Sequence, residues 1–314
     1  MAHNGTTFKL NSGARIPAIG FGTFQDAEVQ EQAIITALKA GYRHIDTARV
    51  YGTEPSVGAA IKKSDIPRSE IFITTKLWNT AHHPDDVEAA IDASLADLGT
   101  DYIDLYLMHW PAAFARGDEL FPADSAGNRL MGDTDYVATY QAMEKLVASG
   151  KARAIGISNF SQAELERLLK ETSIVPAVHQ LELHPYLQQP AFMALHKRLR
   201  IHVTQYSPFA NQNDFYATGT QAKMIDDPVL VEIGKKYGKS GAQVALAWGI
   251  ARGNSVIPKS KTESRIKANL EGDFVLDEAD VERIGGLDRK ARYSDLSAVF
   301  GYEFFRDLDG KKRD

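Results

Sequence analysis

The chain has 314 residues and a net charge of −5, and 44% of its residues are hydrophobic, which is enough for a sizeable core. This charge balance argues against a general nucleic-acid binder, which would carry a basic surface stripe. The chain has no cysteine, so disulfides, thiolate catalysis and Cys-ligated zinc are excluded.

The sequence predicts neither a targeting segment nor a membrane-spanning segment. Residues 1–10 lack a basic region followed by an apolar run, so we expect no signal peptide. No apolar stretch reaches the length that spans a bilayer. We therefore expect a cytoplasmic protein without membrane partners, ending in a solvated basic tail at residues 311–314.

Strand-like segments follow an N-terminal hairpin. Residues 6–18 are predicted to form this hairpin, because Phe8 and Leu10 alternate with polar residues before a turn at residues 11–13. Eight further runs are mostly continuous and apolar, as expected of parallel strands that are buried on both faces. These runs are residues 19–23, 44–47, 71–76, 103–109, 154–159, 178–182, 202–206 and 255–257.

Helix-like segments lie between these strands. The first carries Val29, Ala33 and Ala37 at the spacing of one helical face, and another starts with a proline, which a first helical turn tolerates. Clear examples are residues 28–40, 84–98, 135–149, 161–169, 190–199 and 241–250.

Eight strands that alternate with helices predict a single (β/α)8 TIM barrel domain over residues 1–314, with an N-terminal β-hairpin. An open dinucleotide-binding sheet is disfavoured, because residues 20–24 lack the third glycine of its fingerprint and a helix directly behind it. Long segments at 111–134 and 207–227 are expected to be functional loops. The aromatic tail after Leu287 is expected to pack over the C-terminal rim of the barrel.

Three polar residues stand at the ends of successive predicted strands: Asp46, Lys76 and His109. In a barrel these ends meet at one rim, and Tyr51 follows Asp46 closely enough to reach the same place. Taken alone, the Asp–Lys pair would more often be a structural ion pair, and the histidine a satisfied core residue. Their joint occurrence with a tyrosine favours a catalytic site.

These residue types suit carbonyl reduction, which needs a proton donor at the oxygen. A free tyrosine has a pKa of about 10, and a nearby ammonium favours the phenolate. We therefore expect Lys76 to lower the pKa of Tyr51 while Asp46 holds Lys76 in place. A shift of about two units would need roughly 2.7 kcal/mol. His109 would orient the substrate by donating to its oxygen.

Three segments carry a resemblance to a known family: residues 41–58, 153–160 and 257–269. Through them the chain resembles the aldo-keto reductases over nearly its whole length, and it is similar to the fungal glycerol dehydrogenase and aldose-reductase-like branch. The resemblance implies an NADPH-dependent reductase on a (β/α)8 barrel. It assigns Asp46, Tyr51, Lys76 and His109 as the catalytic set, with Tyr51 as the proton donor.

The same resemblance implies a set of NADPH-binding residues along the rim. From the nicotinamide end to the adenosine end they are Thr23, Ser158, Asn159, Gln180, Tyr206, Ser207, Lys259, Ser260, Lys261, Thr262, Arg265 and Asn269. Independently, Lys259 and Arg265 near a helix start would make a good cation pair for a ribose 2′-phosphate. The alternative is a solvated basic face. Ala268 stands where many relatives carry Glu or Gln, so the adenine contact is an open question.

The predicted substrate pocket contains Phe24, Trp78, His109 and Trp110, with Phe114 and part of the tail. An aromatic pocket suits aldehydes generally. The family resemblance implies small sugar or polyol carbonyls of carbohydrate metabolism as substrates, such as glyceraldehyde, pentoses or uronates, in a reversible reaction. An NADPH-binding regulatory subunit with little turnover is the alternative. We expect a monomer and no metal site, with His82 exposed in a loop.

Overall fold

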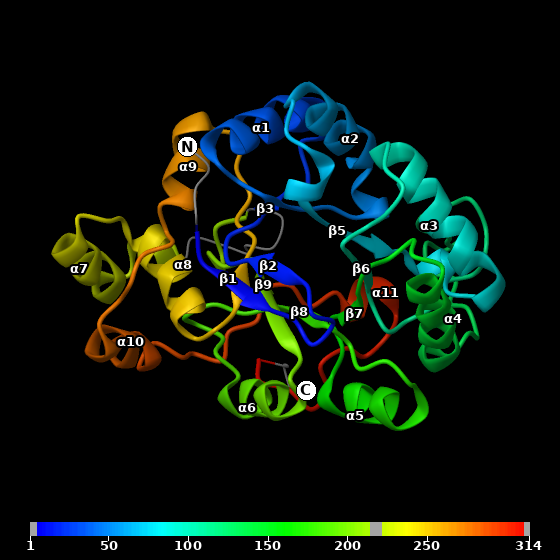
Figure 1. Ribbon diagram of the computed structural model, residues 1–314. Coiled ribbons are helices and arrows are strands. Elements are labelled where there is room, and N and C mark those ends of the chain that lie inside the picture. Colours follow the sequence, from blue (N-terminus) through cyan, green and yellow to red (C-terminus); the bar gives the residue numbers. More distant parts are fainter. Residues whose placement is uncertain (1–4, 214–221, 311–314) are drawn as a thin grey trace.

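The computed structural model describes residues 5–213 and 222–310. Its centre is an eight-stranded parallel sheet surrounded by helices (Figure 1). The strands of this sheet, in chain order, are β3 Phe21–Gly22, β4 His44–Asp46, β5 Phe72–Leu77, β6 Leu105–Met108, β7 Ile155–Ser158, β8 Val178–Glu182, β9 His202–Tyr206 and β10 Ser255–Val256.

The sheet closes on itself. Neighbouring strands follow chain order from β3 to β10, and Ile19 forms a parallel bridge with Val256 across the remaining gap. The Gly20 N–H donates to Val256 O at 2.8 Å. Gly22 permits the close approach, since a Cβ there would lie 3.0 Å from Ile257 O. The predicted (β/α)8 barrel is confirmed.

Helices cover the outside of the barrel (Figure 1). The α-helices are α1 Ala27–Ala40, α2 Glu54–Lys63, α3 Pro84–Leu98, α4 Tyr136–Ala148, α5 Gln162–Glu171, α6 Pro190–Leu199, α7 Pro228–Tyr237, α8 Gly241–Ala251, α9 Glu263–Leu270, α10 Glu278–Gly285 and α11 Ser297–Phe300. The described residues also form four 3-10 helices: η1 Arg49–Tyr51, η2 Arg68–Glu70, η3 Asn79–Ala81 and η4 Met224–Asp226.

The predicted elements agree with these bounds to within a few residues. The helices expected at 84–98 and 190–199 have those bounds, because a proline at the first helical position marks each start. The strand expected at 19–23 is shorter, since regular pairing with β4 involves only Phe21 and Gly22. Helices α2, α7, α9, α10 and α11 were not among the predicted examples.

The hairpin seals one end of the barrel. Strands β1 Thr7–Lys9 and β2 Arg15–Pro17 pair antiparallel, and Figure 1 shows them crossing the middle of the ring of helices. Ile16 is fully buried against the inward-facing residues Leu105 and Val178. The hairpin therefore replaces solvent at the end opposite to the strand carboxyl ends.

The aromatic tail packs onto the opposite end, as predicted. Phe300, Phe304 and Phe305 are buried and form one cluster with Trp78 and Trp110. The tail thus covers part of the rim where the polar strand ends meet.

The first of the two long loops is not a simple irregular segment. In the first, bridges join Phe114 to Met131 and Ala123 to Arg129, so the loop folds back on itself as a small antiparallel flap. In the second, residues 214–221 lie outside the described residues, as do 1–4 and the tail residues 311–314. Within residues 5–213 and 222–310, no helix combines the length and apolarity needed to cross a bilayer.

Candidate active site

The parallel register brings the predicted catalytic residues to one rim. Asp46 ends β4 and pairs with Thr74 on β5, and Lys76 lies two residues further on the same face. His109 directly follows β6, and Tyr51 ends the 3-10 turn η1 that follows β4. Four residues that span 64 positions of the sequence therefore converge because each stands at or just after a strand end.

Lys76 and Asp46 form a buried ion pair. Lys76 Nζ lies 2.6 Å from Asp46 Oδ1 and 2.8 Å from Thr47 O, and its side chain has no solvent exposure. Gln180 Nε2 donates to the other carboxylate oxygen at 2.7 Å. Each charged atom of the pair thus has a polar partner, which a buried ion pair requires.

Burial and attraction act against each other in this pair. Burial raises the pKa of Asp46 and lowers the pKa of Lys76, while the opposite charge of the partner favours the ionised form in both. The short hydrogen bonds to both carboxylate oxygens favour the charged pair. Lys76 is therefore available as an ammonium beside the phenol.

Tyr51 lies against this ammonium. Its ring centre is 5.0 Å from Lys76 Nζ, 5.6 Å from the ring of His109 and 5.1 Å from the ring of Phe24. Burial, with a smaller contribution from the Asp46 charge, raises the pKa of Tyr51 well above 10. The expected lowering by Lys76 is thus wrong for this geometry, because desolvation and the Asp46 charge both act to raise the pKa of the phenol. The phenol keeps its proton at neutral pH.

His109 is neutral at the same pH. Burial, then the charges of Lys76 and His82, hold the pKa of His109 well below 6.5. Its Nδ1 is buried without a hydrogen-bond partner among the described residues. Asn159 fixes the backbone here by donating from Nδ2 to His109 O at 3.0 Å. A neutral imidazole can donate one hydrogen bond to a substrate oxygen.

Two further polar residues near His109 escaped the sequence-based prediction. His82 was expected in an exposed loop, but only 1% of it is exposed and both ring nitrogens are buried without a partner among the described residues. The side-chain amide nitrogen and oxygen of Asn79 are also buried without a hydrogen-bond partner among the described residues. The available signal in the sequence was their closeness to Trp78, directly after a strand end, where barrel enzymes place their active sites.

Threonine hydroxyls support the turn that carries Tyr51. Thr53 Oγ1 lies 2.9 Å from Thr47 Oγ1 and 3.0 Å from Thr23 Oγ1, and all three are fully buried. Thr23, expected near the nicotinamide, also donates to Asp46 O at 3.1 Å. Thr23 and Thr53 therefore tie the first two strand ends together.

The residues expected to bind the nicotinamide end form one hydrogen-bonded network. The Tyr206 hydroxyl donates to Asn159 Oδ1 at 2.7 Å, and Asn159 Nδ2 donates to Ser158 Oγ at 3.0 Å. Ser158 in turn donates to Gln180 O at 3.0 Å. Asn159 adopts a left-handed conformation with φ of 65°, which asparagine tolerates better than most residues. The network connects Tyr206, Asn159 and Ser158 to Gln180, whose side chain binds Asp46.

The cations expected at the adenosine end lie around the start of α9. Lys259 and Lys261 both bind Asp26, whereas Arg265 is exposed and has no ion-pair partner among the described residues. The remaining predicted residues of this end form the turn into α9 or lie on that helix: Ser260, Thr262 and Asn269. Ser207, expected at the pyrophosphate, directly follows β9 with a left-handed φ of 47°.

Aromatic side chains enclose the site. The ring of Trp78 is 5.4 Å from His109 and 5.7 Å from Phe114, and its Nε1 donates to Leu120 O at 2.6 Å. Trp110 stacks beside His109 at 6.2 Å and contacts the tail at Phe304. The predicted pocket residues are thus brought together, and the flap at 111–134 and the tail both contact them.

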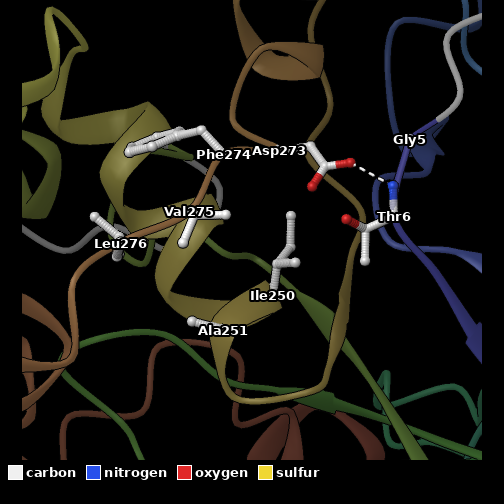
Figure 2. Close-up of a pocket in the computed structure, with 8 residues that line it drawn as sticks. All are labelled: Gly5, Thr6, Ile250, Ala251, Asp273, Phe274, Val275 and Leu276. Atoms are coloured by element: carbon white, nitrogen blue, oxygen red, sulfur yellow. Dashed lines mark hydrogen bonds between the residues drawn. The ribbon is translucent and has the colours of Figure 1, made fainter.

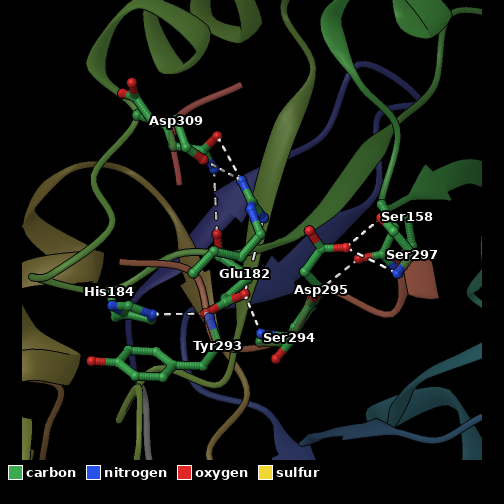
Figure 3. A network of polar contacts seen from close by, with 12 residues as sticks. Ser158, Glu182, His184, Tyr293, Ser294, Asp295, Ser297 and Asp309 are labelled. Atoms are coloured by element: carbon green, nitrogen blue, oxygen red, sulfur yellow. Dashed lines mark hydrogen bonds and ion pairs between the residues drawn. The ribbon is translucent and has the colours of Figure 1, made fainter. Parts of the chain in front are cut away.

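A buried carboxylate anchors the tail. Glu182 ends β8 and accepts hydrogen bonds from the backbone N–H groups of Tyr293 at 2.7 Å and Ser294 at 2.8 Å (Figure 3). His184 Nε2 lies 3.0 Å from the same carboxylate, and the buried Arg292 is 3.9 Å away. Burial alone would raise the pKa of Glu182, but these hydrogen bonds and charges hold it below its usual value. No pattern in the amino-acid sequence predicts this contact.

Cavities at the hairpin end of the barrel are weaker candidates for the active site. One of about 310 Å³ is lined by the N-terminal segment and the chain around α8 and α10 (Figure 2). Among the described residues that line it, Asp273 alone is ionisable, and it accepts a hydrogen bond from the Thr6 N–H at 2.7 Å. No group of three potential metal ligands converges within residues 5–213 and 222–310.

Comparison with known proteins gives a consistent result. Residues 18–289 match the aldo/keto reductase family. The chain is 46% identical to an uncharacterized oxidoreductase of Schizosaccharomyces pombe, with 94% of this chain and 92% of the relative covered. It is 41% identical to the human aldo-keto reductase family 1 member A1, with 90% of each covered. The aldose reductase of Schistosoma japonicum superposes with a TM-score of 0.88 at 33% identity, covering 96% of this chain and 98% of that one.

Proposed function

This chain belongs to the aldo/keto reductase family, and we propose that it reduces the carbonyl groups of aldehydes and ketoses with NADPH. Membership makes it an oxidoreductase of carbonyl compounds. The observation that carries the finer proposal is the position of Lys76 Nζ, 2.6 Å from Asp46 Oδ1 and 5.0 Å from the ring centre of Tyr51. A phenol, an ammonium and a carboxylate at one buried point suit proton donation to a carbonyl oxygen.

The residues present fit NADPH. Ser158, Asn159 and Gln180 would hold the carboxamide of the nicotinamide through hydroxyl and amide groups, and the Tyr206 ring would stack on the nicotinamide. At the other end, the exposed guanidinium of Arg265 and the ammonium groups of the lysines around it suit a 2′-phosphate. When bound, NADPH would supply the hydride for the carbonyl carbon.

Side chains of this protein would donate the proton, stabilise the resulting charge and orient the substrate. Tyr51 donates its proton to the carbonyl oxygen, for which its raised pKa keeps it in the protonated form. Lys76 stabilises the phenolate that the donation leaves, and Asp46 holds the ammonium in position. His109, neutral because burial lowers its pKa, orients the oxygen through one ring N–H. Trp78 and Trp110 exclude water from the reacting groups.

We propose small sugar and polyol-related carbonyls as the substrate class, with the reverse oxidation of polyols open to the same groups. The pocket combines an aromatic wall at Phe24, Trp78 and Trp110 with the polar groups of Tyr51 and His109. A short carbonyl compound bearing hydroxyl groups fits such a mixed lining.

A substrate panel tests the proposal. Trioses, pentoses and uronates are offered with NADPH and with NADH, and consumption of the reduced nucleotide is followed by absorbance. We expect turnover with at least one of these carbonyl classes and a preference for NADPH. Tight NADPH binding without turnover on any of them would instead favour a regulatory NADPH-binding protein.

A further inference from the structure

One ion-pair cluster at the proposed adenosine end is not explained by the reaction. Asp26, in the loop between β3 and α1, accepts hydrogen bonds from both Lys259 and Lys261, the second at 2.9 Å. These two lysines belong to the loop between β10 and α9, more than 230 positions away in the sequence. The carboxylate therefore bridges the first and last strand–helix loops of the barrel.

The position of Asp26 is held by a strained turn. Gln25 and Asp26 both have left-handed conformations, with φ of 68° and 55°, which cost free energy for residues other than glycine. The buried Gln30 stabilises the turn by donating from Nε2 to Gln25 O at 2.6 Å, and Asn213 Nδ2 donates to Gln25 Oε1 at 3.1 Å. Contacts from α1 and from the segment after β9 thus hold Gln25, the residue directly before Asp26.

The Asp26 side chain does not cap helix α1, although an aspartate at this position usually does. It is the N-cap residue of α1, where an aspartate side chain normally accepts from the first backbone N–H groups, yet it makes no such bond. Its carboxylate faces the lysines instead. The side chains of Asp26 and Lys259 are each only 24% exposed. Solvent therefore screens this ion pair less than it would screen a fully exposed one.

We propose that Asp26 is a specificity-determining residue, an internal counter-ion that competes with the 2′-phosphate of NADPH for Lys259 and Lys261 and so narrows the preference for NADPH over NADH. The inference rests on the proposed function, since it needs NADPH as the ligand. A dianionic phosphate entering this site must share two ammonium groups with a carboxylate or displace it. NADH, which has no 2′-phosphate, meets no such competition.

The test uses the full chain and two nucleotides that differ in one group, 2′,5′-ADP and 5′-AMP, titrated by calorimetry. In Asp26→Asn we expect the affinity for 2′,5′-ADP to rise by about threefold or more, the scale of partly exposed ion pairs. The affinity for 5′-AMP should stay unchanged. Glu88→Gln is the matched control, since it removes one carboxylate from an exposed pair with Lys151 far from this loop.

Further variants separate competition from a structural role. Asp26→Ser should reproduce the gain, and the gain should shrink when Lys261→Met is added, because one contested cation is then gone. Unchanged or weakened binding of 2′,5′-ADP in both Asp26 variants would overturn the proposal and make Asp26 a loop-ordering residue. If the unmodified chain bound the two nucleotides equally, the assignment of NADPH itself would fail, and the inference with it.

Discussion

Lys76 donates a 2.6 Å hydrogen bond to Asp46 where neither side chain contacts bulk solvent. The pair connects β4 to β5 across the barrel rim, and Gln180 from β8 completes it at 2.7 Å. Because removal of either partner would leave a buried charge uncompensated, the ammonium is held in one place. Tyr51 packs against that fixed charge, so the proposed proton donor lies beside an ammonium that the barrel strands hold in place.

Replacement of Tyr51 by phenylalanine tests the proton donor. We expect Tyr51→Phe to lower turnover of an aldehyde by at least about 100-fold, the scale of losing a general acid. NADPH binding, followed by fluorescence, should be nearly intact because only the hydroxyl is removed. Tyr237→Phe is the control, since that hydroxyl binds Asp280 at 2.7 Å on the outside of the barrel. Near-normal turnover in Tyr51→Phe would require another proton donor.

The positions of Asp46, Lys76 and His109 could be predicted from the sequence because a parallel barrel brings successive strand ends to one rim. Their electrostatics could not be predicted in the same way. The pKa of Tyr51 depends on how deeply tertiary packing buries the phenol, and no periodic pattern in the sequence reveals that depth. His82 was misplaced for the same reason, since its burial depends on tertiary contacts.

Contacts between distant segments were also beyond prediction. Asp26 with Lys259, and Glu182 with Arg292, join residues separated by more than 100 positions. Charged residues of both signs are frequent in the chain, so no spacing rule selects these pairs. Strand and helix starts such as Pro84 were predictable because local chemistry alone determines them.

Replacement of Arg265 tests the 2′-phosphate assignment. Arg265→Ala should raise the KM for NADPH by about tenfold or more, the scale of a lost charge-assisted hydrogen bond, while the KM for NADH changes little. Steady-state kinetics with both nucleotides measures the two effects. Arg283→Ala, which breaks an exposed pair with Glu232, is the matched control. Equal changes for NADPH and NADH would remove Arg265 from the phosphate site.

The pH dependence of reduction follows from two pKa shifts of opposite direction. Burial raises the pKa of Tyr51 well above 10 and lowers that of His109 well below 6.5. Tyr51 therefore stays protonated and His109 stays neutral between about pH 6 and pH 8. We expect kcat for reduction to be nearly constant over this range. A bell-shaped profile with a midpoint near pH 7 would contradict these protonation states.

Buried histidines should make the fold sensitive to acid. Burial lowers the pKa to about 3 in His44 and His82, and to about 4 in His196 and His202. Below about pH 6.5 the unfolded chain binds protons that the folded chain does not. The free energy of unfolding therefore falls with falling pH, approaching about 1.4 kcal/mol per pH unit for each such histidine.

His82 offers a direct test of this contribution, because neither ring nitrogen has a hydrogen-bond partner among the described residues. Between about pH 6 and pH 4, the free energy of unfolding should fall less steeply with falling pH in His82→Leu than in the unmodified chain. The difference in slope should be about 1.4 kcal/mol per pH unit, which corresponds to one proton. Urea unfolding at several pH values gives the two curves. Parallel curves for the variant and the unmodified chain would mean that His82 takes up its proton in the folded state.

Glu182 should control the order of the tail. In Glu182→Gln the buried Arg292 loses its counter-charge and one backbone N–H of the tail loses a good acceptor, so we expect a loss of about 3 kcal/mol in the free energy of unfolding. Hydrogen exchange should show that protection decreases first at residues 293–305, because Glu182 binds the Tyr293 and Ser294 N–H groups directly.

The same substitution should raise the KM for the carbonyl substrate, since Phe300 and Phe304 of the tail support Trp110. Glu232→Gln, on the exposed face of α7, should change none of these. Unaltered exchange in the tail of Glu182→Gln would show that the aromatic cluster alone holds it.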